Sequence, residues 1–422
     1  MVRRDRQSLP LKWHMPHVLE VLRERGFVQQ ISDEDQLRRR LEQPITLYWG
    51  YDATADSLTQ GHLFSIMMLT WFQRFGHRVI ALAGGGTTMI GDPSGRVSSR
   101  PMLSEEEIDR NLAGIRVQLV RFFDFSAGRA LALNNADWLK GLSFMGFMRD
   151  IGSRFSVNEI LRLEAYRTRL EAGGLTFLEL SYVLVQSYDF LHLYKEYDAI
   201  LQVGGSDQWG NSIAGADLIR RVTGGQAFVL AHPLIMTAAG EKMGKSQAGA
   251  LWLTPERTSP YEYYQQWRNT ADAEVQRLLG VYTFLPMEEV RTLGSLPGAE
   301  LNRAKEVLAF EATKLLHGEE AAERAQSAAR ALFSGTAGDQ NIPSIRIDGA
   351  RLTAGLPVTE LFKDAGLVSS ANEARSLITQ GGLSINGDPV TDPRARIDAA
   401  ALHDGSLLLS RGRKRHIRVI CA

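Results

Sequence analysis

The stretch ITLYWGYDATADSLTQGHLFSIMMLTWFQRFGHRVIALAGGG, residues 45–86, decides the fold class. Residues 45–52 are apolar, rich in β-forming side chains and preceded by Pro44. Residues 61–76 repeat apolar side chains at helical spacing and end on a glycine, whereas residues 77–86 are again an apolar run broken by glycines. A strand, a helix and a strand in this order form a βαβ unit, which predicts a parallel sheet with helices on its faces.

The same pattern returns further along the chain. Residues 197–205 and 227–235 are strand-like, and residues 208–223 between them have helical periodicity. Between the two halves, from about 101 to 190, the periodicity is mainly helical. We therefore predict an α/β fold: a Rossmann-like, doubly wound parallel sheet with a helical insertion (about 101–190), in a first domain spanning 1–238 that carries the chemistry.

The rest of the chain divides into two further parts. Residues 239–333 begin with a lysine-containing loop and continue as an α-helical domain. The polar stretch SGTAGDQNIPS marks a linker, which we place at 334–350. A compact unit at 351–422 follows and ends in a basic run.

Composition excludes several classes of protein. Lys and Arg together number 48, as do Asp and Glu, so no net charge draws the whole molecule toward nucleic acid. The single cysteine, Cys421, excludes an internal disulfide framework and fits a reducing compartment. No apolar run reaches the ~18 residues of a membrane helix, and the basic start lacks the apolar core of a secretion signal. We expect a soluble cytoplasmic protein that does not enter a membrane.

Two glycine-rich stretches follow predicted strands and could hold a ligand. In GGGTTMIGDPSGRVSSR (84–100), the glycines allow close backbone approach and Asp92 could pair with an ammonium or hydroxyl group. Taken alone, this stretch is more often a plain turn. In QVGGSDQWG (202–210), Asp207 suits ribose hydroxyls and Gln208 suits a polar substrate group, at the end of a strand where open α/β sheets bind ligands. The alternative is a strand-to-helix turn with a helix cap.

Two basic stretches suit phosphate groups. In GEKMGKS (240–246), Lys242 and Lys245 lie on a glycine-flanked loop, which suits a polyphosphate whose charge changes during a reaction. A solvated lysine loop is the alternative. In RGRKRHIR, five fixed positive charges suit RNA phosphates, although a basic tail can also be merely solubilising. These charges belong to Arg411, Arg413, Lys414, Arg415 and Arg418.

Taken together and in this order, the stretches resemble the tyrosyl-tRNA synthetases of bacteria and mitochondria, a family of class I aminoacyl-tRNA synthetases. The resemblance runs from about Pro44 to the C-terminus and rests on LYWGYD, ADSL followed by GHL, IGDPSG, SYVLVQSYDF, QVGGSDQWGN, KMGKS and a terminal S4-like RNA-binding module. It implies that the third part, 351–422, is a small α+β S4-like domain, and that 239–333 lies on the anticodon side.

The resemblance also assigns roles to residues. Tyr48 and Asp189 match the pair that hydrogen-bonds the phenolic hydroxyl of tyrosine, which disfavours phenylalanine because it would leave buried polar groups unpaired (these synthetases are the standard example). The residues that match the family's tyrosine pocket are Tyr48, Asp92, Tyr182, Gln186, Asp189, Gln202 and Gln208. Those that match its ATP site are Gly50, Asp52, Thr59, Gly61, His62, Gly205, Asp207 and Lys245. The expected catalytic residues are Thr54, His62, Lys242, Lys245 and Ser246. The expected RNA-binding residues are Arg375, Arg411, Arg413, Lys414 and Arg415.

Several positions depart from the family pattern, including Gly244 in place of the first serine of the Lys-Met-Ser-Lys-Ser loop. Thr59 stands where the signature usually written His-Ile-Gly-His has its first histidine, and Gln60 replaces an aliphatic residue. A threonine hydroxyl cannot carry charge, and a lost transition-state donor costs on the order of 10²–10³ in rate unless Thr54 and the lysines compensate. Trp49 replaces a small residue next to the ribose, and Ser376 replaces an arginine in the S4-like helix.

The implied reaction has two steps: tyrosine and Mg-ATP give tyrosyl-adenylate and pyrophosphate, and the terminal ribose of tRNA(Tyr) then takes the tyrosyl group. ATP with Mg²⁺ is expected as a substrate, with no tightly bound metal held by the protein. By resemblance we expect a homodimer formed near residues 130–170. Two alternatives stay open: a specialised paralog with an altered ATP site that activates tyrosine or an analogue, and a catalytically weakened RNA-binding protein.

Overall fold

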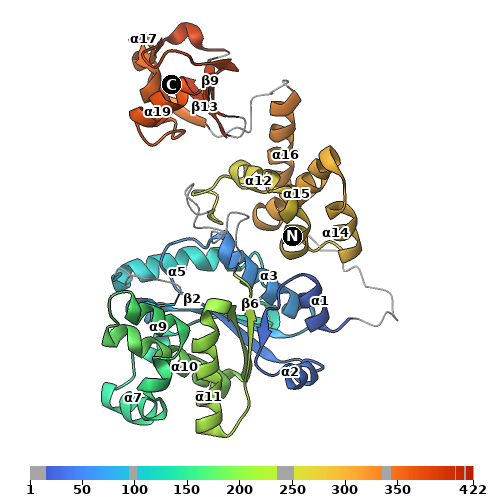
Figure 1. The fold of residues 1–422 in the computed structure, drawn as a ribbon, viewed down its shortest axis with the longest axis vertical. Coiled ribbons are helices and arrows are strands. Elements are labelled where there is room, and N and C mark those ends of the chain that lie inside the picture. Colours follow the sequence, from blue (N-terminus) through green and yellow to red (C-terminus); the bar gives the residue numbers. More distant parts are fainter. Residues whose placement is uncertain are drawn as a thin grey trace. The chain divides into compact units, whose positions relative to one another are not determined.

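The computed structural model describes residues 16–94, 102–234, 251–334, 344–403, 405–412 and 415–421, and it divides into two compact units. The first unit comprises 1–257 and 271–301, and the second comprises 258–270 and 302–422. Figure 1 shows the order of the elements along the chain. Among the described residues, no helix has the length and apolar character needed to cross a membrane.

The first unit is built around a six-stranded sheet with the order β1-β6-β5-β2-β3-β4. The strands are β1 (Gln30–Ile31), β2 (Thr46–Tyr51), β3 (Arg78–Ala83), β4 (Ala130–Asn134), β5 (Ala199–Gly205) and β6 (Phe228–His232). All neighbouring pairs run parallel except β1, which lies antiparallel to β6 at one edge. The chain winds from β2 toward β4 in one half and from β5 toward β6 in the other. The predicted doubly wound parallel sheet is confirmed.

Helices cover both faces of this sheet because side chains alternate along each strand. On β2, Tyr48 packs against Phe190 of α10, with ring centroids 5.1 Å apart, whereas the next residue, Trp49, lies beside His62 of α3. The helices of the first half are α1 (Val18–Glu24), α2 (Glu34–Arg40), α3 (Gln60–Arg74), α4 (Gly85–Ile90), α5 (Glu105–Leu119) and α6 (Ala136–Leu139). Those that follow are α7 (Phe144–Asp150), α8 (Val157–Ile160), α9 (Glu164–Glu171), α10 (Phe177–Tyr197), α11 (Trp209–Thr223), α13 (Val275–Tyr282) and α14 (Met287–Gly294).

The long helix α10 has clear local signals at both ends. Thr176 and Glu179 form a reciprocal capping box at its start, in which the Glu179 amide donates to the Thr176 hydroxyl (3.2 Å) and the Thr176 amide donates to the Glu179 carboxylate (2.9 Å). At its end, Asp198 takes a left-handed conformation (φ 52°) that turns the chain into β5. These two signals fix the position of the residues that α10 presents toward the sheet.

Two details differ from the sequence prediction. The description of residues 101–190 as helical is wrong for 130–134, because β4 pairs in parallel with β3 at the edge of the sheet. A five-residue edge strand followed at once by helix α6 leaves little period-2 signal among helices. Residues 85–90 form the short helix α4, where the sequence indicated the end of a strand at residue 86 followed by a glycine-rich ligand-binding stretch or turn.

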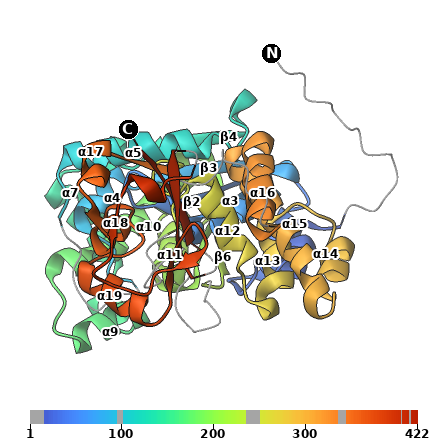
Figure 2. The same ribbon diagram turned by 90° about the horizontal axis from the view of Figure 1, so that it is seen from above.

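The second unit contains three helices and a small α+β domain. The helices are α12 (Pro260–Arg268), α15 (Leu301–His317) and α16 (Glu319–Ser334). The small domain has a five-stranded sheet, β10-β9-β12-β13-β7, and a two-stranded one, β11-β8. Its helices α17, α18 and α19 lie to one side of the strands in Figure 2 and bury Leu352, Phe362 and Ile378 against the sheet. This agrees with the predicted α+β domain.

The elements of this small domain are short. Its strands are β7 (Ser344–Ile347), β8 (Leu356–Pro357), β9 (Leu383–Ile385), β10 (Asp388–Pro389), β11 (Arg396–Ile397), β12 (Ser406–Arg411) and β13 (Arg415–Cys421), and its helices are α17 (Gly349–Thr353), α18 (Val358–Asp364) and α19 (Ala371–Thr379). The linker prediction, 334–350, is wrong at its C-terminal end, because β7 lies within it and pairs in parallel with β13. Ile347 is buried in the domain core, so the small domain begins at or before Ser344.

Candidate active site

A cavity of about 420 Å³ lies beside the carboxyl ends of β2 and β5, where the two halves of the sheet diverge. This is the switch point at which open α/β sheets bind ligands. Every predicted tyrosine, ATP and catalytic residue that the structure describes lines this cavity. They are Tyr48, Gly50, Asp52, Thr54, Thr59, Gly61, His62, Asp92, Tyr182, Gln186, Asp189, Gln202, Gly205, Asp207 and Gln208.

Tyr48 lies at one end of the cavity, and its hydroxyl is one of two buried polar atoms of the described cavity lining that have no hydrogen-bond partner. The other is the Gln186 side-chain oxygen. The Tyr48 side chain is 1% exposed, and burial, followed by the charge of Asp189, holds its pKa well above the ordinary value. The hydroxyl is therefore a neutral donor at any physiological pH. Buried polar groups are normally paired, so two unpaired ones lining one cavity indicate a polar ligand.

Asp189 is the buried carboxylate of this end of the cavity. Its two oxygens accept hydrogen bonds from the Asn135 amide and from the Trp138 indole, both at 2.8 Å. Burial raises its pKa to about 7, the two hydrogen bonds oppose that rise, and the charge of Asp52 adds to it. Asn135 and Trp138 follow β4, the strand that the sequence did not predict, and this strand brings them close to Asp189.

The raised pKa of Asp189 makes a pH dependence predictable. We expect the KM for a phenolic ligand to fall roughly tenfold between pH 6 and 8, because only the ionised carboxylate accepts the phenol proton. The stability of the free protein should fall where the affinity for the ligand rises. Between about pH 4 and 7 the folded state holds a proton that the unfolded state has lost, so stability falls as pH rises through this window and is level above it. Steady-state kinetics and denaturant unfolding across this pH range measure the change in KM and the change in stability. If Asp189→Asn leaves the pH profile of KM unchanged, the pH dependence does not come from Asp189.

Asp92 belongs to a second polar cluster that lines the cavity. The Gln208 amide donates to one Asp92 oxygen (2.6 Å), and the Ser94 backbone amide donates to the other (2.9 Å). Asn211 on α11 donates weakly to the Ser94 hydroxyl and to the Gln208 oxygen (3.4 and 3.5 Å). The cluster fixes the carboxylate of Asp92 toward the cavity, where it could bind an ammonium group.

The start of α3 forms one corner of the cavity. Thr59 is the N-cap residue, and its backbone amide (3.1 Å) and hydroxyl (3.0 Å) both approach Nδ1 of His62. Because the backbone amide can only donate, Nδ1 accepts and the neutral ring carries its proton on Nε2. The Thr59 hydroxyl thus orients His62. Trp49 is 5% exposed and packs between Tyr51 and His62 at the same wall.

Two glycines leave room for carboxylates that line the cavity. A side chain at Gly205 would lie 2.6 Å from an Asp207 oxygen, and one at Gly84 would lie 2.6 Å from an Asp52 oxygen. Asp52 accepts a hydrogen bond from the Thr87 hydroxyl of α4 (3.1 Å). Both carboxylates therefore sit against bare backbone and can approach a sugar closely.

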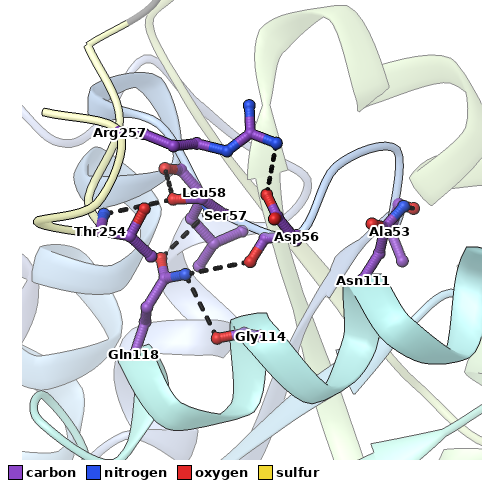
Figure 3. Close-up of polar contacts among 9 residues, drawn as sticks. All are labelled: Ala53, Asp56, Ser57, Leu58, Asn111, Gly114, Gln118, Thr254 and Arg257. Carbon is purple, nitrogen blue, oxygen red and sulfur yellow. Dashed lines mark hydrogen bonds and ion pairs between the residues drawn. The ribbon is translucent and has the colours of Figure 1, made fainter.

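The segment before this corner is held between two neighbours, as Figure 3 shows. From α5, the Gln118 amide accepts from the Leu58 backbone (3.1 Å) and donates to the carbonyls of Asp56 and Gly114. Gly114 lets α5 approach, because a Cβ there would lie well inside contact distance of the Asp56 carbonyl.

From the other side, residues 251–257 are bound to the same segment. The Leu253 amide donates to the Leu58 carbonyl, and the Gln60 amide donates to the Leu251 carbonyl, both at 2.9 Å. Arg257 pairs with Asp56 at 2.6 Å. The position of Thr59 and His62 is therefore determined by α5 and by 251–257 as well as by α3 itself.

Several predicted residues lie outside this description. Lys242, Lys245, Ser246, Arg413 and Lys414 are not among the described residues, and the side chain of Arg415 is not described. Within the small domain, Arg375 is exposed on α19. Arg411 instead donates to the Leu367 carbonyl and pairs with Glu373, each at 2.9 Å. Arg418 is only 8% exposed, so it does not belong to the surface charge that the sequence indicated.

Sequence reasoning missed several residues of the cavity region, among them Asn135, Trp138, Ser65 and His232. The first two were hidden by the helical reading of 101–190. Ser65 and His232 lie in an ordinary helix and strand, and no local pattern marks them. Among the described residues, no group of three or more His, Cys, Asp or Glu side chains could hold a metal ion.

Comparisons with known proteins agree on one family. Residues 40–334 match the family of class I tRNA synthetases for tryptophan and tyrosine, and residues 336–419 match the C-terminal domain of tyrosine–tRNA ligases. The tyrosine–tRNA ligase of Caldanaerobacter subterraneus subsp. tengcongensis is 49% identical over 404 residues, which is 96% of this chain and 99% of that protein. The Clostridium beijerinckii enzyme of the same name is 48% identical with the same coverage.

The fold has solved relatives as well. A C-terminally truncated mitochondrial tyrosyl-tRNA synthetase from Aspergillus nidulans superposes with a TM-score of 0.69 at 28% identity. The match covers 75% of this chain and 94% of that structure. A tyrosyl-tRNA synthetase from Archaeoglobus fulgidus, solved with L-tyrosine, shares the fold at 17% identity and a TM-score of 0.57.

Proposed function

The chain belongs to the tyrosine–tRNA ligases, and from this premise we propose that it activates L-tyrosine with ATP and charges tRNA(Tyr) for protein synthesis. A carboxylate oxygen of tyrosine attacks the α-phosphorus of ATP, and pyrophosphate leaves with its electron pair to give tyrosyl-adenylate. The 3′-terminal ribose hydroxyl of the tRNA then attacks the acyl carbon and expels AMP. No side chain forms a covalent intermediate, so the protein contributes positioning and charge stabilisation.

The observation that carries the proposal is the pair of polar groups at the buried end of the cavity. The Tyr48 hydroxyl has no partner, and Asp189 titrates near neutral pH. A phenolic hydroxyl placed between them would accept from Tyr48 and donate to Asp189. Phenylalanine would leave the buried Tyr48 hydroxyl unpaired, at a cost of about 1–3 kcal/mol, and would offer no donor to Asp189 beyond Asn135 and Trp138.

The remaining residues have roles along the cavity. Asp92, with Tyr182 and Gln186, would bind the α-amino group of tyrosine. Gln208 would lie near the tyrosine carboxyl group, and Gln202 would form part of the pocket floor. Gly50, Asp52, Gly61, Gly205 and Asp207 would hold the nucleotide, with Asp207 on the ribose hydroxyls. His62, Thr54, Lys242, Lys245 and Ser246 would stabilise the phosphates as negative charge shifts toward pyrophosphate.

Thr59 is the position where a substitution is expected to raise the rate of tyrosyl-adenylate formation. We expect Thr59→His to raise the rate of tyrosyl-adenylate formation roughly tenfold, because the imidazole adds a donor worth about one hydrogen bond to the phosphates. Loss of the threonine cap should lower stability by about 1 kcal/mol. Single-turnover activation kinetics, with thermal unfolding alongside, test this. A properly folded variant that activates tyrosine no faster than the parent would rule out the missing-donor explanation.

Mg²⁺ is proposed as part of the ATP substrate. The triphosphate brings its own oxygen ligands, and Mg²⁺ in such enzymes is bound largely through substrate phosphates. Asp52 and Asp207 are better placed for the sugar, against the open glycines on that side. The ion would neutralise the phosphates that the lysines also contact.

We further propose that two copies associate through α7–α10. Large apolar side chains are exposed on these helices, including Phe144 at 65% and Phe177 at 62%. The exposed apolar residues of these helices are Phe144, Met145, Val157, Leu170, Phe177 and Leu178. Such a concentration on one set of helices is typical of a surface that another chain covers. A sedimentation mass of one chain at micromolar concentration would contradict a dimer.

RNA binding is proposed for the small C-terminal domain. Arg375 is exposed on α19, and the run 413–415 adds three positive charges to the same domain. Arg411 supports this surface indirectly through Glu373 and the Leu367 carbonyl. Because tRNA(Tyr), ATP and tyrosine meet in the cytoplasm, the protein would act there.

Tyrosine-dependent exchange of labelled pyrophosphate into ATP tests the proposed function. The matched reactions contain phenylalanine or no amino acid. Exchange with tyrosine alone is the expected result, and it would show that tyrosine itself is a substrate. No exchange under any condition, with tRNA binding retained, would instead establish an RNA-binding protein that has lost catalysis.

A further inference from the structure

Ser65 and His232 form a buried pair in the cavity that the proposed chemistry does not use. Ser65 lies on α3, one turn beyond His62, and His232 is the last residue of β6. Their side chains lie 2.7 Å apart, between the serine hydroxyl and Nε2 of the histidine. Both residues line the cavity although Ser65 is 4% and His232 6% exposed, and the imidazole packs against Phe64 at 4.6 Å.

The direction of the hydrogen bonds in this pair is fixed. Nδ1 of His232 lies 2.9 Å from the Pro233 carbonyl, which can only accept, so Nδ1 carries a proton. Burial lowers the His232 pKa to about 4, against smaller opposing contributions from Pro233 and Asp207, so the ring is neutral and Nε2 is an acceptor. The Ser65 hydroxyl must therefore donate to Nε2. Its oxygen can then offer only lone pairs to the cavity.

The pair lies on the side of the cavity away from Asp189. The phenol end lies toward β3 and β4, since Asp189 is bound to Asn135 just beyond β4. His232 ends β6, which is two strands from β2 in the opposite direction, or roughly 10 Å away. Gly205 and Asp207 lie between, and a Cβ at Gly205 would be 3.7 Å from the His232 ring. If the tyrosine carboxylate meets the α-phosphate of ATP in the middle of the cavity, the nucleoside of ATP would extend toward this pair.

We propose that His232 holds the Ser65 hydroxyl as an acceptor for a hydrogen-bond donor of the nucleoside, and that this pair determines which nucleoside triphosphates the site accepts. The donor is the exocyclic amino group of adenine or a ribose hydroxyl. Ser65 would contact the nucleotide, and His232 is a positioning residue that acts through Ser65. The proposal rests on the proposed function in one respect, namely that the cavity takes a nucleoside triphosphate.

The test compares nucleotides in tyrosine-dependent pyrophosphate exchange. The substrates are ATP, purine riboside triphosphate, which lacks the amino group, and the 2′-deoxy and 3′-deoxy forms of ATP. We expect Ser65→Ala to lower kcat/KM for ATP roughly three- to tenfold, the effect of one hydrogen bond. For the analogue that lacks the donor bound by Ser65, kcat/KM should be the same with Ser65→Ala as with the parent protein. His232→Phe frees the Ser65 hydroxyl to donate, so it should reduce the preference for ATP over the analogue that lacks the donor. Ser65→Thr keeps the hydroxyl and should keep this preference.

A control on the same helix separates selectivity from helix damage. The Thr70 hydroxyl donates to the Ile66 carbonyl (2.8 Å) and does not line the cavity, so Thr70→Ala should leave the ratios between nucleotides as they are. Loss confined to nucleotides with the amino group identifies the base as the source, and loss confined to those with a ribose hydroxyl identifies the sugar.

Equal losses with every nucleotide, or none, would overturn the inference. If His232→Phe does not fold, Ser65→Ala still decides. A parent protein without any tyrosine-dependent exchange would refute the proposed function itself, which is a different outcome.

Discussion

Tyr48→Phe is expected to make the protein more stable and less selective at the same time. The Tyr48 hydroxyl is buried without a hydrogen-bond partner, so removing it relieves about 1 kcal/mol or more of desolvation cost in the free protein. With substrate bound, we propose that the same hydroxyl donates to the phenolic oxygen. Its loss should lower kcat/KM for tyrosine by roughly 10–10² and leave phenylalanine unaffected, so discrimination between the two falls by that factor.

Pyrophosphate exchange with both amino acids, together with denaturant unfolding of the free protein, measures both effects. Tyr166→Phe is the matched control for stability, because the Tyr166 hydroxyl is also buried but lies 3.4 Å from the Asn211 oxygen. This variant should be less stable than the parent. If Tyr48→Phe lost stability to the same extent, the Tyr48 hydroxyl would have a structural partner and the assignment of the phenol site would be wrong.

His62 carries the second large effect, and two substitutions separate its two roles. Nδ1 orients the ring by accepting from Thr59, and Nε2 carries the proton that would be donated to the phosphates. His62→Asn keeps an acceptor near the position of Nδ1 and removes the distal donor. We expect tyrosyl-adenylate formation to slow by on the order of 10²–10³, the usual cost of losing one transition-state donor.

His62→Gln does the opposite, since its amide reaches the position of Nε2. It should retain far more activity than His62→Asn, even though its helix cap is the weaker of the two. Single-turnover activation rates and melting temperatures of both variants distinguish these roles. An equal loss of rate in the two variants, in step with a loss of stability, would mean that His62 acts only as part of the helix cap.

The sequence predicts the sheet well because its central strands are long apolar runs. β2, β3, β5 and β6 are buried on both faces, as parallel strands usually are, and the helices between them have regular apolar spacing. β4 is different: it lies at the edge, alternates only weakly and is followed at once by helix α6. Tertiary pairing with β3, rather than local pattern, determines this strand.

The candidate site could be predicted only where a motif or a family resemblance marks it. Tyr48, His62 and Asp207 belong to such motifs, and the structure brings them to one cavity. Asn135 and His232 belong to none. Their importance depends on the distance to Asp189 and to Ser65, and those residues are 54 and 167 positions away in the chain. Contacts of this kind follow from the folded arrangement alone.

Gly114 limits how this sequence can change over generations. It sits inside α5, where alanine would be the better helix former by up to about 1 kcal/mol, so selection for a stronger helix alone would replace it. Any side chain there would press on the Asp56 carbonyl and move the segment that carries Thr59 and His62. Proteins that descend from this one and keep tyrosine activation are therefore expected to keep glycine at position 114, although alanine would stabilise the helix locally. Outward residues of the same helix, such as Val117, which is 63% exposed, can drift freely by comparison.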